Sequence, residues 1–410
     1  MRSRIYPVLL CSLLAALLPT ACGMQPAEAP AEPEMIEAAE VPGEEPAVKT
    51  EFTREELLAD YDQLWKILEE DDLFLPVIEE RGIDWEQLRA DYRERLRTQE
   101  PDVASFAALI RQMFGQMENF AHLQFVTTET LAVYASSDPA AYPGTDPWYE
   151  LTQSPQTQAV YALLAAGDEP AETEYPEVET AYYADCKTAC FHFRTLNYFV
   201  TERDSTVVAD YLATLPEVEH VIIDITGNSG GNSDYVVNNI IAPLGGGEDW
   251  TRNVYLRDTP LTEQFFFENE SFDVQPVSAL TEPVPESVTA LGMEYFYARG
   301  GEMPSPEPVS YDRWLLIDSR VYSSSEYLAA YCKATGWATL VGTTTRGDGV
   351  ACTSPVMAAL PNTGLLIRFT CVAGVNMDGT LNAETGTKPD YPCKSGELPL
   401  SKCLELIRNG

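Results

Sequence analysis

The sequence predicts an α/β protein with a layered core and a helical N-terminal part. Apolar side chains recur at helical spacing through residues 53–117. From residue 181 onward, short buried strands alternate with helices. The chain has 410 residues, which is too long for one ordinary hydrophobic core, so we expect at least two packed units.

Residues 51–128 are expected to form the helical subdomain. Thr53 and Glu56 have the spacing of a capping box, in which each side chain satisfies the other residue's backbone N–H. The apolar stripes that follow are assigned to the core and given no binding role. His122 lies just after the third stripe.

Residues 129–180 are rich in Pro, Ala, Thr, Glu and Tyr and show little periodicity, so an irregular insertion with one short helix at 157–166 is expected. Residues 181–410 are expected to form the α/β core. The expected strands are 189–196, 220–225, 314–318, 339–342 and 365–369, and the expected helices are 206–215, 233–241 and 324–335.

The N-terminus has the features of an export signal. Arg2 and Arg4 precede an apolar run at 8–18 that is too short to span a bilayer, and Pro-Thr-Ala-Cys follows, ending at Cys22. Small residues before a cysteine resemble the bacterial lipobox, which implies a signal peptide at 1–22 and lipidation of Cys22. The alternative is an ordinary secretory signal cleaved nearby.

Residues 23–50 are dominated by Pro, Ala and Glu, a composition that buries too little apolar area to fold. We expect a flexible stalk that holds the folded part away from the membrane. The expected location is therefore extracytoplasmic, with lipid anchoring to the bacterial cell membrane.

Charge and side-chain counts exclude several classes of function. With 26 Lys and Arg against 64 Asp and Glu, the net charge is −38, which repels nucleic acid. The nine Cys and three His show no zinc-like spacing, so we expect no metal and no cofactor. Seven Cys remain after Cys11 and Cys22, so at least one thiol is unpaired within the chain, and export permits disulfides among the others.

One candidate for chemistry is the glycine-rich turn at 227–231, which fits the G-x-S-x-G pattern of an α/β-hydrolase with Ser229 as nucleophile. That fold needs its catalytic His after the nucleophile, and all three His precede Ser229. The turn is better suited to an oxyanion hole, because glycines let backbone N–H groups point at one place. The alternative is a tight turn without a binding role.

A second candidate is the serine run 323–325, which lies between a predicted strand and a predicted helix. The positive end of a helix stabilises a developing negative charge, which suits a nucleophile at Ser323. Serine is also a common helix N-cap, so a purely structural role is the alternative.

Five segments of the chain carry motifs in the order of one known family. Residues 221–231 contain a strand followed by Asp, Asn and two glycines, and residues 315–326 contain an apolar strand, Asp and Ser-x-Ser-Glu. Residues 341–347 and 386–390 contain Val-Gly-x-x-Thr-x-Gly and Gly-x-x-Pro-Asp, and His122 ends a helical region. In this order the chain resembles the C-terminal processing (tail-specific) peptidases and their tricorn-core relatives, which implies a ClpP/crotonase-like layered core.

The resemblance also implies site residues, with one departure. Many members use a Ser-Lys dyad whose Lys lies between two glycines, but that position holds Asp348 here. The tricorn-type branch uses Ser, His and Glu, and its pattern assigns Ser323 as nucleophile, His122 as general base and Glu384 as orienting acid, with Asp348 as the rival acid. The implied oxyanion hole consists of Gly230, Gly231 and the backbone of Ser324.

These assignments predict a serine peptidase that hydrolyses peptide bonds of peptides or proteins through an acyl-enzyme on Ser323. The missing Lys and the altered surroundings of His122 leave a second hypothesis, a catalytically inactive binding lipoprotein. An esterase that uses the same site is a third.

Overall fold

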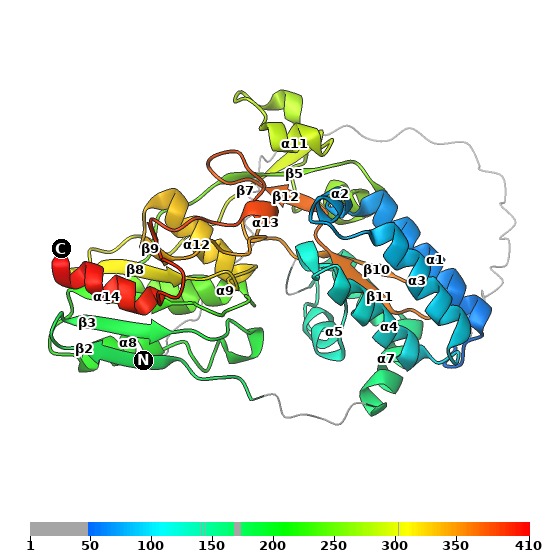
Figure 1. The fold of residues 1–410 in the computed structure, drawn as a ribbon, viewed down its shortest axis with the longest axis horizontal. Helices are drawn as coiled ribbons and strands as arrows, with labels where there is room; N and C mark the ends of the chain where they lie inside the picture. Colours follow the sequence, from blue (N-terminus) through cyan, green and yellow to red (C-terminus); the bar gives the residue numbers. More distant parts are fainter. Residues whose placement is uncertain (1–47, 141, 143, 168–173, 302) are drawn as a thin grey trace, which may run out of the picture.

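The computed structural model describes residues 48–140, 142, 144–167, 174–301 and 303–410. The predicted signal peptide, Cys22 and most of the predicted stalk lie outside the described residues. Figure 1 shows a helical part that contains the N-terminal helices and, beside it, a layered α/β part. The α/β class with a helical N-terminal region is thereby confirmed.

The helical part begins with four helices, α1 (Arg54–Asp71), α2 (Leu75–Glu80), α3 (Trp85–Thr98) and α4 (Val103–Gln116). The predicted capping box is present at α1, where the Thr53 side chain accepts from the Glu56 N–H and the Glu56 side chain accepts from the Thr53 N–H. A 3₁₀ turn η1 (Phe120–His122) and a short strand β1 (Gln124–Phe125) follow. The helices predicted from the apolar stripes are therefore found.

The segment 129–180 is more regular than predicted: the helix expected at 157–166 is found, and two helices that were not predicted precede it. The segment contains α5 (Thr128–Ala135), α6 (Asp146–Gln153) and α7 (Pro155–Gly167). Helices this short depend on tertiary contacts rather than on a strong stripe of their own. Trp148 illustrates this dependence, since its ring packs edge-on against Phe265 and its indole N–H donates to the Pro355 carbonyl.

The layered part is built on a six-stranded sheet with the order β13-β9-β8-β4-β3-β2, in which only the β2–β3 pair is antiparallel. Its strands are β2 (Glu179–Tyr183), β3 (Thr188–His192), β4 (His220–Asp224), β8 (Asp312–Ile317), β9 (Thr339–Gly342) and β13 (Tyr391–Pro392). The central strands are continuous apolar runs because both faces of a mainly parallel sheet are covered.

Alternate residues of these strands enter two different apolar clusters. Ile223 and Leu315 pack with the helices of one face, and Ile222 and Leu316 pack with the C-terminal helix on the other. The covering helices are α8 (Val207–Thr214), α9 (Ser233–Tyr235) with its π-helical continuation η3 (Val236–Ile241), α12 (Ser324–Thr335) and α14 (Pro399–Asn409).

Two small antiparallel sheets complete the fold, with orders β1-β11-β10 and β12-β5-β7-β6. Their further strands are β5 (Arg252–Leu256), β6 (Gln275–Pro276), β7 (Tyr295–Arg299), β10 (Val356–Ala359), β11 (Leu366–Phe369) and β12 (Val372–Gly374). The remaining elements are η2 (Tyr198–Val200), η4 (Ala242–Leu244), α10 (Pro260–Thr262), η5 (Glu263–Phe267), η6 (Val277–Ala279), α11 (Glu286–Ala290) and α13 (Asn382–Thr385).

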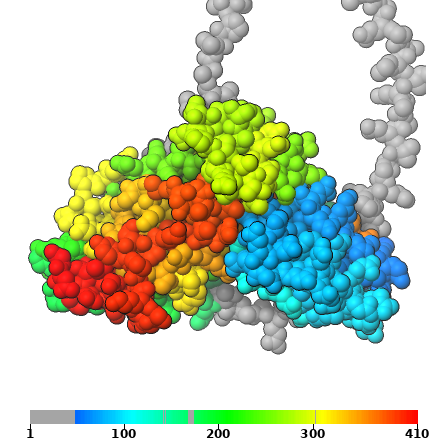
Figure 2. Space-filling view, turned by 45° about the horizontal axis from the view of Figure 1, so that its top comes forward, coloured from blue at the N-terminus to red at the C-terminus, as the bar shows by residue number. Residues whose placement is uncertain are grey.

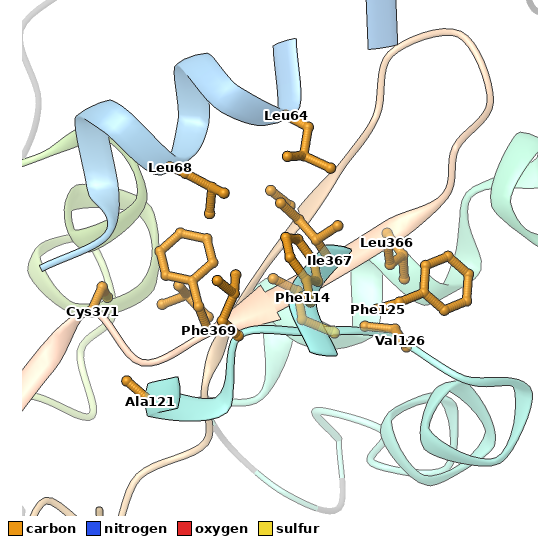
Figure 3. Packing of buried hydrophobic residues seen from close by; sticks show 14 of the residues in the cluster. Leu64, Leu68, Phe114, Ala121, Phe125, Val126, Leu366, Ile367, Phe369 and Cys371 are labelled. Carbon is orange, nitrogen blue, oxygen red and sulfur yellow. The ribbon is translucent and has the colours of Figure 1, made fainter. Parts of the chain in front are cut away.

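The core of the helical part includes residues that are far away in sequence. Leu64 and Leu68 of α1 lie over Ile367 and Phe369 of β11, with Phe114 of α4 in the same cluster (Figure 3). β11 also pairs with β1, which follows η1. Residues near 360–370, which the sequence assigned to the C-terminal core, therefore belong to the N-terminal packing unit. Figure 2 shows the N-terminal helices and the C-terminal segment on opposite sides of the molecule, with the region around α11 at the top.

All seven cysteines after Cys22 are free thiols. Within the described ranges, none of the helices combines the length and the apolar character that crossing a membrane requires.

A buried carboxylate ties α1 to the loop between β10 and β11. Asp60 is 0% exposed and accepts four hydrogen bonds of 2.6–2.9 Å, two from Asn362 and two from Thr363. The link therefore joins segments separated by about 300 residues and fixes β11 in the N-terminal core.

We expect Asp60→Ala to lower the free energy of unfolding by about 2–4 kcal/mol, because four donors, two of them on the buried Thr363, lose their acceptor. Asp62→Ala, which breaks the exposed ion pair with Arg93, is the matched control and should cost less than about 1 kcal/mol. Urea unfolding of both variants measures the difference. Equal losses would contradict the assigned role of Asp60.

Candidate active site

Ser323 precedes the first residue of α12, after a turn that leaves β8. Its backbone has φ 57° and ψ −123°, a conformation that is rare for a residue with a Cβ. The side chain makes no capping hydrogen bond to the helix; instead Oγ lies 2.9 Å from Nε2 of His122. The structure therefore brings together the predicted nucleophile and base, which are 201 residues apart.

Hydrogen bonds hold both the backbone and the ring of His122. Its N–H donates to the hydroxyl of Tyr322 at 2.8 Å, and Nδ1 lies 2.6 Å from Oδ2 of Asp348. With a carboxylate at Nδ1, the proton of a neutral imidazole lies on that nitrogen, and Nε2 is left to accept from the Ser323 hydroxyl. The His122 side chain is only 12% exposed, which limits competition from water.

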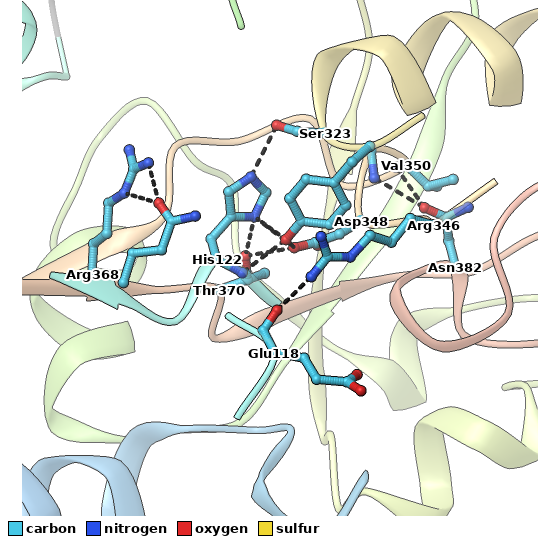
Figure 4. Close-up of polar contacts among 12 residues, drawn as sticks. Glu118, His122, Ser323, Arg346, Asp348, Val350, Arg368, Thr370 and Asn382 are labelled. Carbon is cyan, nitrogen blue, oxygen red and sulfur yellow. Dashed lines mark hydrogen bonds and ion pairs between the residues drawn. The ribbon is translucent and has the colours of Figure 1, made fainter. Parts of the chain in front are cut away.

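Asp348 supplies the carboxylate of this arrangement, and its side chain is 5% exposed. Its Oδ2 also accepts from the Tyr322 hydroxyl at 2.9 Å and from the Thr370 hydroxyl at 3.1 Å (Figure 4). Burial favours a raised pKa for Asp348, but the charge and hydrogen bond of His122, with the two hydroxyls, lower its pKa below the ordinary value. The carboxylate is thus held ionised against the imidazole.

The assignment of Glu384 as the orienting acid requires correction. Glu384 lies in the short helix α13 with its side chain exposed, and it makes no hydrogen bond with His122. Asp348 occupies the position beside Nδ1. The physical reason is the loop geometry, because Gly347 and Gly349 let the loop carrying Asp348 lie close to Asn382 and to the start of α12.

The glycine turn at 227–231 lies directly against the start of α12. Asn228 is buried and joins the two, since its Oδ1 accepts from the Ser325 hydroxyl at 2.8 Å and from the Gly230 N–H at 2.9 Å. The Ser324 hydroxyl donates to the Gly231 carbonyl at 2.9 Å. A Cβ at Gly230, where φ is +101°, would lie 2.8 Å from the Ser323 Cβ, so only glycine permits this approach.

The predicted oxyanion donors divide into two groups. The Gly230 N–H donates to Asn228, so its assignment as an oxyanion donor is corrected: this glycine provides space, not a free donor. The N–H groups of Gly231 and Ser324 donate to no acceptor within the described part of the chain. Both N–H groups are therefore unused by the described residues, and the Gly231 backbone is joined to the start of α12 through the Ser324 hydroxyl.

A further buried network supports the loop that carries Asp348. Oδ1 of Asn382 accepts from the N–H groups of Gly349 and Val350, and its Nδ2 donates to Oε1 of Glu326 at 2.6 Å. Glu326 is 0% exposed, and its Oε2 has no hydrogen-bond partner among the described residues. Burial raises the pKa of Glu326 to about 7.

Tyr322 and Thr370 also contact His122 and Asp348, although neither was predicted from the sequence. Tyr322 adjoins Ser323 in sequence, and the centroid of its ring lies 4.7 Å from that of the His122 ring. Burial together with the neighbouring Asp348 raises the pKa of Tyr322 well above the ordinary value. Thr370 follows β11, which only the three-dimensional pairing with β1 brings to the site. No sequence motif marked either residue.

The other two histidines lie away from the site, and Ser229 has no base beside it among the described residues. His192 approaches Glu179 at 3.6 Å, and His220 approaches Asp312 at 3.5 Å, both on strands of the large sheet. Ser229 borders the groove, but no histidine hydrogen-bonds to it within the described ranges. None of the three forms a second nucleophile–base pair.

The raised pKa of Glu326 predicts a pH-dependent stability. Between about pH 4.5 and about 7 the folded state retains a proton that the unfolded state loses, so stability from this group is present at low pH and lost as pH rises. Glu326→Gln has no titratable carboxyl at this position. Between pH 5 and pH 8 its free energy of unfolding, measured with urea, should therefore rise by about 3 kcal/mol relative to that of wild type.

Asp72, whose pKa burial also raises to about 7, titrates in the same window but is present in both proteins and cancels in the comparison. The exposed Glu384→Gln is the control and should follow the wild-type curve. Parallel curves for Glu326→Gln and wild type would rule out the inferred protonation.

The chain is similar to one protein family and to several solved structures. Residues 193–393 match the model of peptidase family S41, a range that includes Ser323 and Asp348, whereas His122 precedes it. A putative peptidase from Parabacteroides merdae has a similar structure, with a TM-score of 0.50 and 15% identity over 86% of this chain and 96% of that one. At this identity the likeness shows the fold alone.

Two other solved structures are more distant. Mature CPAF complexed with lactacystin has a TM-score of 0.47 and 13% identity over 87% of this chain and 97% of that one. The photosystem II D1 C-terminal processing protease has a TM-score of 0.38 and 14% identity over 84% and 94%. No curated protein sequence matches the chain at a significant level. Residues 193–393 thus form a peptidase family S41 domain, which supports the resemblance of the motifs to the C-terminal processing peptidases.

Proposed function

We propose that this protein is a serine peptidase that cleaves peptide bonds with Ser323 as nucleophile, His122 as general base and Asp348 as the orienting acid. The observation that carries the proposal is the continuous chain from Ser323 Oγ to His122 Nε2 at 2.9 Å and from His122 Nδ1 to Asp348 at 2.6 Å. Nucleophile, base and orienting group within hydrogen-bond reach are the elements that acyl transfer requires.

In the proposed first step, Ser323 Oγ attacks the scissile carbonyl carbon while His122 Nε2 takes the hydroxyl proton. The carbonyl oxygen becomes an oxyanion, which the N–H groups of Gly231 and Ser324 stabilise. The nearby carboxylate of Asp348 stabilises the imidazolium that forms. His122 then gives the proton to the leaving amine, and the acyl group stays on Ser323.

In the second step, a water molecule donates a proton to His122 as its oxygen attacks the acyl carbon, and Ser323 recovers that proton as the acid product leaves. This route needs no lysine. Asp348, which holds the position of the family's lysine, does not take the serine proton itself but acts through His122.

We also propose that the mature chain begins at a lipidated Cys22 and is held on the outer side of a bacterial cell membrane. This proposal rests on the sequence pattern around Ala21 and Cys22 and on the composition of 23–50. Metabolic labelling with a fatty-acid analogue, compared between wild type and Cys22→Ala, tests it. Equal label in both would reject it.

The nucleophile assignment predicts that a fluorophosphonate probe labels the purified protein on Ser323. Labelling should be lost in Ser323→Ala and retained in Ser229→Ala, because Ser229 has no base. Mass spectrometry of the labelled peptide identifies the residue. Label on another serine would overturn the assignment, and absence of all labelling and turnover would favour the inactive binding protein.

The acid assignment predicts a contrast between two carboxylates. Asp348→Asn should lower kcat by about 1,000- to 10,000-fold, because His122 loses the partner that fixes its tautomer. Glu384→Gln should leave kcat within about two-fold, since its side chain points to solvent. Turnover of casein and of a matched ester substrate measures both effects and separates a peptidase from an esterase. The reverse ranking would restore Glu384 as the acid.

A further inference from the structure

The groove around the site differs in charge from the rest of the chain. It has a volume of about 790 Å³ and is bordered by three arginines, Arg299, Arg346 and Arg368. Apart from Asp348, which pairs with His122, its carboxylates are Glu129 and Asp234. The whole sequence has 26 basic against 64 acidic residues, so the groove, with three arginines against three carboxylates, lacks the acidic excess of the protein.

None of the three arginines forms an ion pair with a described carboxylate, although carboxylates are abundant in this chain. The Arg346 guanidinium packs over the Tyr322 ring and donates to the backbone carbonyl of Glu118. The Arg299 side chain makes no hydrogen bond within the described ranges. Its charge opposes the rise that burial causes in the pKa of Asp234, but the two groups form no ion pair.

Arg368 has the position that best suits contact with a substrate. It lies on β11 two residues before Thr370, whose hydroxyl contacts both His122 and Asp348. Two residues of extended chain span about 6.6 Å, so Arg368 and Thr370 are close along the chain. Figure 4 shows Arg368 beside His122. A peptide held at Ser323 therefore has side chains within reach of this guanidinium.

The hydrogen bonding of Arg368 leaves donors free. Its Nε and Nη2 both point to the single Oε1 of Gln124, at 3.2 and 2.5 Å. The Gln124 amide is neutral and fixes the orientation of the guanidinium without cancelling its charge. An arginine has five N–H donors in a planar fork, so three remain for a ligand. A carboxylate matches the geometry of this fork.

We propose that the groove selects peptides with an Asp or Glu side chain close to the scissile bond, and that Arg368 binds this side chain. The inference deepens the proposed peptidase function and rests on it for the identity of the site. The excess negative charge of the protein repels acidic peptides at long range, whereas Arg368 attracts them at contact range, where salt screens less.

Binding to Ser323→Ala tests the inference without turnover. The probes are labelled decapeptides, acetylated and amidated at their ends, that differ only by Glu or Gln at one position in turn. At about 0.15 M salt, fluorescence anisotropy should show about 10-fold tighter binding of one Glu peptide than of its Gln partner. Equal affinities at every position, or no binding of any peptide, would overturn the inference.

Two variants in the Ser323→Ala background assign the effect to Arg368. Arg368→Gln should abolish the preference for Glu. Gln124→Glu should do the same while keeping the arginine, because a carboxylate at Gln124 neutralises the guanidinium in place. Arg97→Gln changes the net charge equally on the exposed surface of α3, outside the groove, and should keep the preference. A preference that survives in both groove variants would overturn the role of Arg368.

A further set of probe peptides in the binding experiment has a free C-terminal carboxylate and no acidic side chain. If they bind as tightly as the amidated Glu peptide while the latter shows no advantage over Gln, the groove recognises a chain terminus and the inference fails. If the proposed peptidase function is wrong, the outcome is different: the wild-type protein shows neither Ser323-dependent labelling nor turnover.

Discussion

The site depends on one buried oxygen, Oδ2 of Asp348, on which three donors converge. The imidazole of His122, the hydroxyl of Tyr322 and the hydroxyl of Thr370 reach it from three segments that are far apart in the chain. A buried carboxylate is costly unless its lone pairs are satisfied. The helical part, the start of α12 and the end of β11 must therefore meet correctly before Asp348 can be ionised, and this requirement couples the fold to the chemistry.

Backbone strain is concentrated at the same place. Ser323, His122 and Asp348 all have positive φ values, of 57°, 57° and 61°, although each has a Cβ. Such conformations cost about 1–3 kcal/mol each and persist only where surrounding contacts enforce them. Here the Tyr322 hydroxyl holds the His122 backbone, and the Gly347 carbonyl accepts from the Ser323 N–H. The strain aims three side chains at one another, which regular helix or strand geometry does not achieve.

The sequence predicted the elements whose pattern is local. Residues 324–335 and 339–342 were predicted with the boundaries that α12 and β9 have, because a Ser-rich start, a glycine end and an apolar run mark them. The four-stranded sheet with β5 and β7 was not predicted, since its stability comes from pairing between distant segments. The acid was assigned to Glu384 for a related reason. A motif gives the order of residues but cannot show which loop two flanking glycines bring close.

The position of Asp348 explains how a family pattern built on lysine can accommodate a carboxylate. Next to a serine hydroxyl, a lysine amine can accept a proton directly, whereas an ionised carboxylate of low pKa is a poor base for it. With His122 between Ser323 and Asp348, the carboxylate no longer has to accept the serine proton. The loop that carries Asp348 needs only to hold a negative charge on the far side of the imidazole. His122 comes from the helical part and precedes the matched family domain, so residues 193–393 contain the proposed nucleophile and the proposed acid but not the proposed base. The helical part thus completes the site, in addition to packing against it.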